Sequence, residues 1–182
     1  DISDDTQMTL FTAEGMLLGI RHRMPMPACV YQSYLNWYRT QYPRAKGGVF
    51  CKESELMKVE GLFRREAPGN TCLSALGSGR IGLLDEPINN SKGCGGVMRT
   101  APCGMLKLIH APDPEDAYAL QGAQAAAITH GHILGYVPAA MLADVVFAPG
   151  QGELPTGILW LAAVAYALQI YFDFSGYSDM AI

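Results

Sequence analysis

Residues 28–42, ACVYQSYLNWYRTQY, place their large apolar side chains at the spacing of one helix face. That face comprises Val30, Tyr31, Tyr34, Leu35 and Tyr38. No segment alternates apolar and polar residues for long enough to form a half-buried strand. The sequence therefore predicts an all-α fold for residues 1–146, without internal repeats.

Capping and helix-breaking residues predict where the other helices begin and end. Ser3 or Asp4 caps a helix over residues 6–20, in which Gly15 is a mildly weak position. Asp113-Pro114-Glu115-Asp116 has the cap, proline and acids of another helix start. Further helices are predicted at 53–59, at 71–76, along the Ala-rich run to 129 or 130, and over 133–146, where Pro138 requires a late start or a kink.

The residues after 146 differ in composition from the residues before them. The glycines and prolines of FAPGQGELPTG predict a linker at 147–157. Residues 158–172 are apolar apart from Gln169, and this run is shorter than the roughly 20 residues of a membrane-spanning helix. We expect an apolar helix over 158–182, either buried or interfacial, or the start of a span if the chain continues. Any membrane contact is then restricted to 158–172.

Charge and cysteine content exclude two broad classes of function. The net charge of −4 does not favour general binding to nucleic acids. The five cysteines form no CxxC pair and no Cys/His group at zinc spacing. An odd number of cysteines without a signal peptide indicates free thiols and a reducing compartment, so the prediction for residues 1–146 is cytoplasmic.

The tetrapeptide Ser3-Asp4-Asp5-Thr6 permits two interpretations. Its acids suit the positive end of a helix, and many helices begin this way. The same oxygens also suit Mg²⁺, which prefers carboxylate, hydroxyl and water ligands. The tetrapeptide by itself favours the plain helix start.

Two further stretches suggest a binding site. NNSKGCGGVMRTAP, residues 89–102, places three glycines ahead of a stretch compatible with a helix, an arrangement that lets backbone N–H groups approach a phosphate. Most glycine-rich loops are plain turns. His130 and His132 in THGHILGY lie on different faces of a helix, which argues against zinc binding by this pair.

Considered together, four stretches of the sequence resemble the motifs of one known family. SDDTQMTLFTAEG, PGNTCLSAL, NNSKGCGGVMRTAP and THGHILGY resemble, in order and approximate spacing, the ADP-ribosylglycohydrolase family over residues 1–146. The resemblance implies an all-α fold and a centre of two Mg²⁺ ions, with Mn²⁺ as a substitute. It also implies cleavage of the bond between ADP-ribose and a modified protein side chain or a small-molecule conjugate.

The resemblance assigns roles to individual residues. Ser3, Asp4 and Asp5 resemble the first cluster of metal ligands, and Asp4 and Asp5 are the implied catalytic residues. The implied substrate-binding residues are Asn70, Ser91, Lys92, Gly93, Cys94, Gly95 and His130, with His130 on the adenosine side. Arg99 is expected either to favour the diphosphate electrostatically or to pair with a nearby acid.

Two of the family's segments have no counterpart here. The N-terminal Gly-Asp motif and the C-terminal Asp-rich metal cluster do not occur in this sequence. We therefore expect a domain truncated at both ends, with impaired turnover. An alternative is a module that binds ADP-ribose without hydrolysing it.

The end of the chain resembles another family. LPTGILWLAAVAYALQIYFDFSGYSDMAI, residues 154–182, is similar to a segment of the membrane-bound O-acyltransferases of the alginate acetylation type. This resemblance implies a fusion with an unrelated, membrane-associated fragment and carries no active-site residue. A membrane O-acyltransferase fragment is the remaining alternative for the function.

Overall fold

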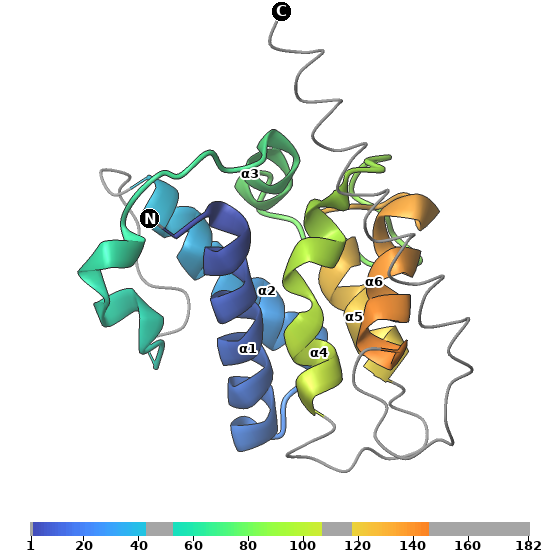
Figure 1. The fold of residues 1–182 in the computed structure, drawn as a ribbon, viewed down its shortest axis with the longest axis horizontal. Helices are drawn as coiled ribbons and strands as arrows, with labels where there is room; N and C mark the ends of the chain where they lie inside the picture. Colours follow the sequence, from blue (N-terminus) through green and yellow to red (C-terminus); the bar gives the residue numbers. More distant parts are fainter. Residues whose placement is uncertain (1, 43–52, 107–117, 146–182) are drawn as a thin grey trace, which may run out of the picture. The chain divides into compact units, whose positions relative to one another are not determined.

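The computed structural model describes residues 2–42, 53–106 and 118–145 (Figure 1). They belong to the first of two units into which the chain divides, Asp1–Phe147 and Ala148–Ile182. The six α-helices described are α1 (Asp4–His22), α2 (Met26–Gln41), α3 (Asn70–Gly77), α4 (Ala101–Met105), α5 (Tyr118–Ala127) and α6 (Ile133–Val145). Three 3₁₀ helices accompany them: η1 (Leu56–Lys58), η2 (Glu60–Leu62) and η3 (Cys94–Arg99).

Helices α1 and α2 form an antiparallel pair joined by a short turn (Figure 1). The two backbones approach most closely at Gly15, where a Cβ atom would lie 2.7 Å from the Cα atom of Val30. Only a residue without a side chain permits this approach. Gly15, predicted as a weak helix position, is thus the point at which the two helices meet.

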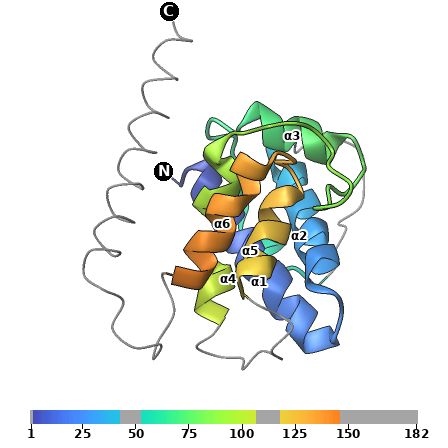
Figure 2. The ribbon, with the colours of Figure 1, turned by 90° about the vertical axis from the view of Figure 1, so that its right-hand side faces the viewer.

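Helices α5 and α6 form a second antiparallel pair (Figure 2). Gly122 of α5 lies so close to α6 that a Cβ atom there would be 2.6 Å from the carbonyl oxygen of Ala139. Both η3 and α4 contact α1 on one side and α5 and α6 on the other. The segment 94–105 therefore joins the two helix pairs.

The core contains mainly large apolar side chains, together with several buried polar groups. The largest buried apolar side chains are Met8, Phe11, Met16, Val30, Tyr34, Trp37, Leu76 and Ile128. The side chain of Gln7 is also buried, and its Oε1 atom accepts hydrogen bonds from Trp37 Nε1 (3.1 Å) and Gln41 Nε2 (2.9 Å). These bonds offset the cost of removing a polar group from water.

The predicted all-α fold is confirmed for the described residues, none of which forms a strand. Helix α6 does not begin late, since it runs from Ile133 through Pro138. Within the short helix predicted at 53–59, the structure has the single 3₁₀ turn η1 at Leu56–Lys58, and η2 follows at Glu60–Leu62. The helix start at 113–116, the linker at 147–157 and the apolar helix at 158–182 lie outside the described residues.

None of the helices within the described ranges is long and apolar enough to span a membrane. The four cysteines in those ranges, Cys29, Cys72, Cys94 and Cys103, are free thiols, as predicted. Burial raises the pKa of Cys103 to about 12, so its thiol stays protonated at neutral pH.

Candidate active site

The start of α1 has the predicted cap. Ser3 Oγ accepts a hydrogen bond from the backbone N–H of Thr6 (3.4 Å) and lies 3.2 Å from Thr6 Oγ1. Asp4 and Asp5 follow in the first turn, where the positive end of the helix favours carboxylates. The predicted helix start is therefore confirmed, and it fixes the two carboxylates on a helix, a placement that is compatible with both interpretations of the tetrapeptide.

Asp4 is partly buried and has a partner outside its own helix. Its Oδ2 atom accepts a hydrogen bond from the backbone N–H of Gly69 (3.2 Å). Burial raises the pKa of this carboxyl above its ordinary value, against the opposing effects of nearby N–H groups and of the positive charge of Arg99. Asp5 is partly buried too, and its backbone carbonyl accepts a hydrogen bond from Thr9 Oγ1 (2.8 Å).

The N-terminus of α3 connects these carboxylates with the glycine-rich loop. Gly69 directly precedes Asn70, the exposed first residue of α3. The next residue, Thr71, accepts a hydrogen bond through its hydroxyl from Ser91 Oγ (3.4 Å). The start of α1, the whole of α3 and the start of α6 lie at the same end of the helices (Figures 1 and 2).

The loop 91–95 has an internal hydrogen-bond framework. Ser91 Oγ accepts a hydrogen bond from the N–H of Gly93 (3.3 Å). The Asn89 side chain accepts from the N–H groups of Ser91 (3.0 Å) and Gly131 (3.1 Å) and donates to the carbonyl of Thr129 (2.8 Å). Asn89 thus fixes the loop to the turn that carries His130. Lys92 and Gly93 are exposed, whereas Cys94 and Gly95 are partly buried.

His130 lies directly beneath the two glycines of this loop. A Cβ atom at Gly93 would be 3.4 Å from His130 Nε2, and one at Gly95 would be 3.4 Å from Cε1 of the same ring. The residue is 2% exposed. Burial, and then the positive charge of Arg99, lower its pKa to about 3, so the imidazole is neutral at physiological pH. His132 has a different role, because its Nδ1 atom accepts from the N–H of Leu134 (3.0 Å) at the start of α6.

Arg99 is fully buried behind this site. Its guanidinium carbon lies 4.5 Å from the centre of the Tyr34 ring, and it donates to Cys72 Sγ (3.3 Å) and to the Ala125 carbonyl (3.3 Å). Within the described ranges no carboxylate lies within 4 Å of it, so the expected ion pair does not form there. Its charge acts on Asp4 through space, lowering the pKa of that carboxyl.

The first metal cluster suits a hard cation in its chemistry but supplies few ligands. Ser3, Asp4 and Asp5 offer hydroxyl and carboxylate oxygens, the donors that Mg²⁺ prefers. A cation would also relieve the unfavourable burial of the Asp4 charge. Across residues 2–42, 53–106 and 118–145, however, no group of three or more His, Cys, Asp or Glu side chains could hold a metal. The described residues therefore supply suitable oxygen ligands for one side of a cation site only.

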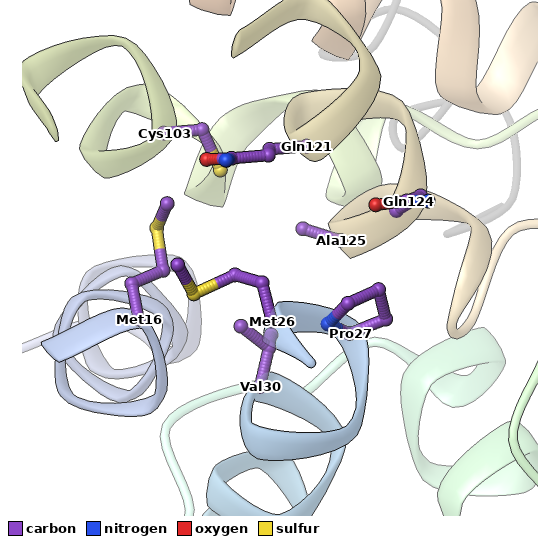
Figure 3. Close-up of a pocket in the computed structure, with 8 residues that line it drawn as sticks. All are labelled: Met16, Met26, Pro27, Val30, Cys103, Gln121, Gln124 and Ala125. Carbon is purple, nitrogen blue, oxygen red and sulfur yellow. The ribbon is translucent and has the colours of Figure 1, made fainter. Parts of the chain in front are cut away.

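A pocket between α1, α2, α4 and α5 is separate from these residues. Figure 3 shows the side chains of Met16, Met26, Cys103 and Gln121 around it. It has no room for a water-sized sphere. None of the predicted site residues lines it, and we assign it to the packing between the helices.

Asp4→Asn is expected to raise the midpoint of thermal unfolding of the metal-free protein at neutral pH. Because burial raises the pKa of Asp4 above 3.8, the folded state binds this proton more tightly than the unfolded state does, and ionisation costs stability as pH rises. Asparagine keeps an oxygen for the Gly69 N–H but carries no charge. Below pH 3.8 the gain should vanish, because Asp4 is then protonated in both states.

Thermal scans with a chelator at neutral and acid pH measure this difference. Asp85→Asn removes an exposed carboxylate and serves as the control, with no gain expected. A lower midpoint for Asp4→Asn than for the parent chain at neutral pH would contradict the assignment of burial as the dominant effect on Asp4.

The relationship to known proteins follows from a family model. The model described as ADP-ribosylglycohydrolase matches residues 1–179. This chain belongs to the ADP-ribosylglycohydrolase family. The match extends beyond residue 146, where the motifs of this family were predicted to end. An ADP-ribosylglycohydrolase fold is all-helical, in agreement with the described residues.

A second similarity concerns a short part of the chain. It is 58% identical over 43 residues to the probable alginate O-acetylase AlgI of Azotobacter vinelandii and 60% identical over 43 residues to that of Pseudomonas aeruginosa. These residues are 24% of this chain and 8% of each relative. The chain thus spans less than a tenth of the curated relatives it matches, in agreement with the predicted segment resemblance. No solved structure matches this chain.

Three residues that contact the candidate site residues of this ADP-ribosylglycohydrolase family member have no role predicted from the sequence. They are Gly69, which binds Asp4; Asn89, which fixes the loop; and Thr129, which contacts both Arg99 and His130. Only the role of Asn89 could have been found from the local sequence. Asparagine is typical of Asx-turns, in which its side-chain oxygen accepts from the backbone N–H two residues later, here that of Ser91. Gly69 binds a partner 65 residues away, and Thr129 binds Arg99, 30 residues away, in addition to its neighbour His130.

Proposed function

We propose that this chain contributes to Mg²⁺-dependent hydrolysis of the glycosidic bond between ADP-ribose and a modified protein side chain or a small-molecule conjugate. One observation carries the proposal: the N-terminus of α3 binds the Asp4 carboxylate through Gly69 and the glycine-rich loop through Thr71. A substrate with a sugar at one end and a diphosphate in the middle suits a site of this composition.

The roles of the residues follow from their chemistry. We propose that Asn70, Ser91, Lys92, Gly93, Cys94, Gly95 and His130 bind the ADP-ribose portion, and that Ser3, Asp4 and Asp5 hold the divalent ion. When bound, such ions orient sugar hydroxyls and activate water. The negative charge of Asp4 and Asp5 would favour the positive charge that develops at the anomeric carbon in the transition state.

Binding of ADP-ribose without turnover is the second candidate. It is favoured by the small number of metal ligands within the described part of the chain. The glycine loop and His130 do not depend on a metal for their positions, because protein hydrogen bonds fix them. A binder would retain affinity for ADP-ribose and release no product from an ADP-ribosylated substrate.

The O-acyltransferase similarity leads to a narrower proposal. We propose that residues 154–182 derive from a membrane protein fragment fused to this domain and that any membrane contact is confined to residues 158–172. No acyl transfer is proposed, because the matching residues are 8% of the alginate O-acetylases. Residues 1–146 would act in the cytoplasm.

A thermal-shift titration with ADP-ribose tests the proposal, carried out on the full chain with Mg²⁺ and with a chelator. We expect ADP-ribose to raise the unfolding midpoint, and more so with Mg²⁺. Incubation with an ADP-ribosylated protein then separates the candidates, because hydrolysis releases free ADP-ribose and binding alone does not. The absence of any ADP-ribose-induced shift under both conditions would refute both of them.

A further inference from the structure

The side chain of Arg99 determines the hydrogen bonding of its neighbour Thr129. A guanidinium has only N–H donors, so every group that it binds must act as an acceptor. One of its terminal nitrogens donates to Thr129 Oγ1 and to the carbonyl of Ala125. The other donates to Cys72 Sγ. Because Arg99 is fully buried, water does not replace these acceptors.

Thr129 in turn determines which nitrogen of His130 carries the proton. Thr129 Oγ1 accepts from Arg99 and from the thiol of Cys72 (4.0 Å), which fills both lone pairs of the hydroxyl oxygen, and it lies 2.8 Å from His130 Nδ1. A hydroxyl has one proton, and Arg99 cannot accept it. That proton is therefore donated to Nδ1, which must be unprotonated. A neutral imidazole bonded in this way carries its own proton on Nε2.

The protonated Nε2 faces the glycine-rich loop. Cβ atoms at Gly93 and Gly95, which these residues lack, would lie 3.4 and 3.5 Å from Nε2. No described residue forms a hydrogen bond with this nitrogen. The neutral state has two causes, burial and the adjacent charge of Arg99, which lower the pKa of His130 to about 3.

We propose that Thr129, oriented by Arg99, is a positioning residue that holds His130 as the Nε2–H tautomer, so that His130 presents one neutral donor, beside the loop 91–95, to a hydrogen-bond acceptor of the ligand. A ring nitrogen or a sugar oxygen is an acceptor of this class. That the ligand is ADP-ribose rests on the proposed function, whereas the tautomer of His130 does not.

The tautomer is measured on the full chain with ¹⁵N-labelled histidine. Long-range ¹H–¹⁵N spectra distinguish a protonated Nε2 from a protonated Nδ1, and His130→Asn assigns the signals. We expect the Nε2–H pattern for His130, unchanged as pH is lowered through 6.5, the ordinary pKa of histidine. A protonated Nδ1, or titration near pH 6.5, would overturn the proposal.

Two substitutions of Thr129 test the positioning role. Thr129→Ser keeps the hydroxyl and should keep the spectrum of the parent chain. Thr129→Val has the same shape without the hydroxyl, so His130 should show a mixture of tautomers. If Thr129→Val does not fold, Thr129→Ser and the parent spectrum still decide the proposal, since loss of the Nε2–H pattern in either contradicts it. An unmixed Nε2–H pattern in folded Thr129→Val would show that Thr129 does not set the tautomer.

Gly93→Ala tests whether the Nε2–H group is used in binding. Gly93 has φ −62° and ψ 155°, which alanine adopts without strain, and the added methyl lies at van der Waals distance from Nε2. It covers the donor, and we expect ADP-ribose affinity to fall up to about tenfold in calorimetry, the range for one lost hydrogen bond.

Gly61→Ala is the matched control, because nothing lies within 4 Å of its Cβ position, and its affinity should equal that of the parent chain. Unchanged affinity in Gly93→Ala would refute the use of the donor. If the parent chain itself does not bind ADP-ribose, the proposed function fails, and the spectra still decide the tautomer.

Discussion

Gly15→Ala is expected to lower the free energy of unfolding by about 2–3 kcal/mol, the upper part of the range of about 1–3 kcal/mol for overpacking a core. At an ordinary helix position the same change would stabilise the protein by about 1 kcal/mol. The sign reverses here because the added Cβ atom would lie 2.7 Å from Val30 Cα and 3.0 Å from the carbonyl oxygen of Cys29. Both are backbone atoms of α2, so the whole helix must move to make room.

Urea unfolding followed by circular dichroism measures this effect, with Gly61→Ala as the control. Gly61 has open space around its Cβ position, so this substitution should leave the unfolding midpoint nearly unchanged. If Gly15→Ala were as stable as the parent chain or more stable, α1 and α2 would not approach each other as closely as the structure places them.

Asp4→Asn combined with Asp5→Asn is expected to abolish the Mg²⁺-dependent part of the stabilisation by ADP-ribose. A ligand at 100 times its dissociation constant stabilises a protein by about 2.7 kcal/mol, or roughly 5–10 °C in a chain of this size. Without their charges the two side chains lose most of their attraction for a divalent ion, while their shapes and the Gly69 contact are retained. Thermal shift with ADP-ribose, with and without Mg²⁺, measures the loss.

The matched control is Asp85→Asn with Glu86→Gln, which neutralises two adjacent exposed acids that are not among the predicted site residues. This control should retain the full shift. If the Asp4/Asp5 variant also retained it, the divalent ion would bind elsewhere and the proposed metal role of the opening acids would be wrong. Unfolding of the variant is not expected to cause the loss, because Asp4→Asn by itself should stabilise the metal-free protein.

Local rules were sufficient for much of the helical structure. The cap at Ser3 and the helix face from Val30 to Tyr38 depend on neighbours within a few residues, and both are found in the structure. The helix start at Asn70 is one residue from the predicted one. The helix predicted over 133–146 is found as α6, and the late start considered because of Pro138 does not occur, since one proline costs one backbone hydrogen bond and α6 packs against α5.

The candidate site was predictable only in part. The motifs predicted the family, which the family model confirms. The roles of Ser3, Asp4, Asp5, Asn70, the loop 91–95 and His130 remain predictions. From the sequence, the partner of Arg99 was undecided between the diphosphate of a ligand and a nearby acidic side chain. Its observed partners include Cys72 and Thr129, 27 and 30 residues away, and no local pattern brings such residues together.

The sequence by itself determined that this chain forms helices, where α1 starts, and to which family it belongs, because each depends on residues that are adjacent or regularly spaced. Only the tertiary structure decided that Gly15 is a contact between helices and that His130 is neutral beside a buried Arg99. Both outcomes depend on atoms brought together from distant parts of the chain, whose distances and burial set the sterics and the charge state.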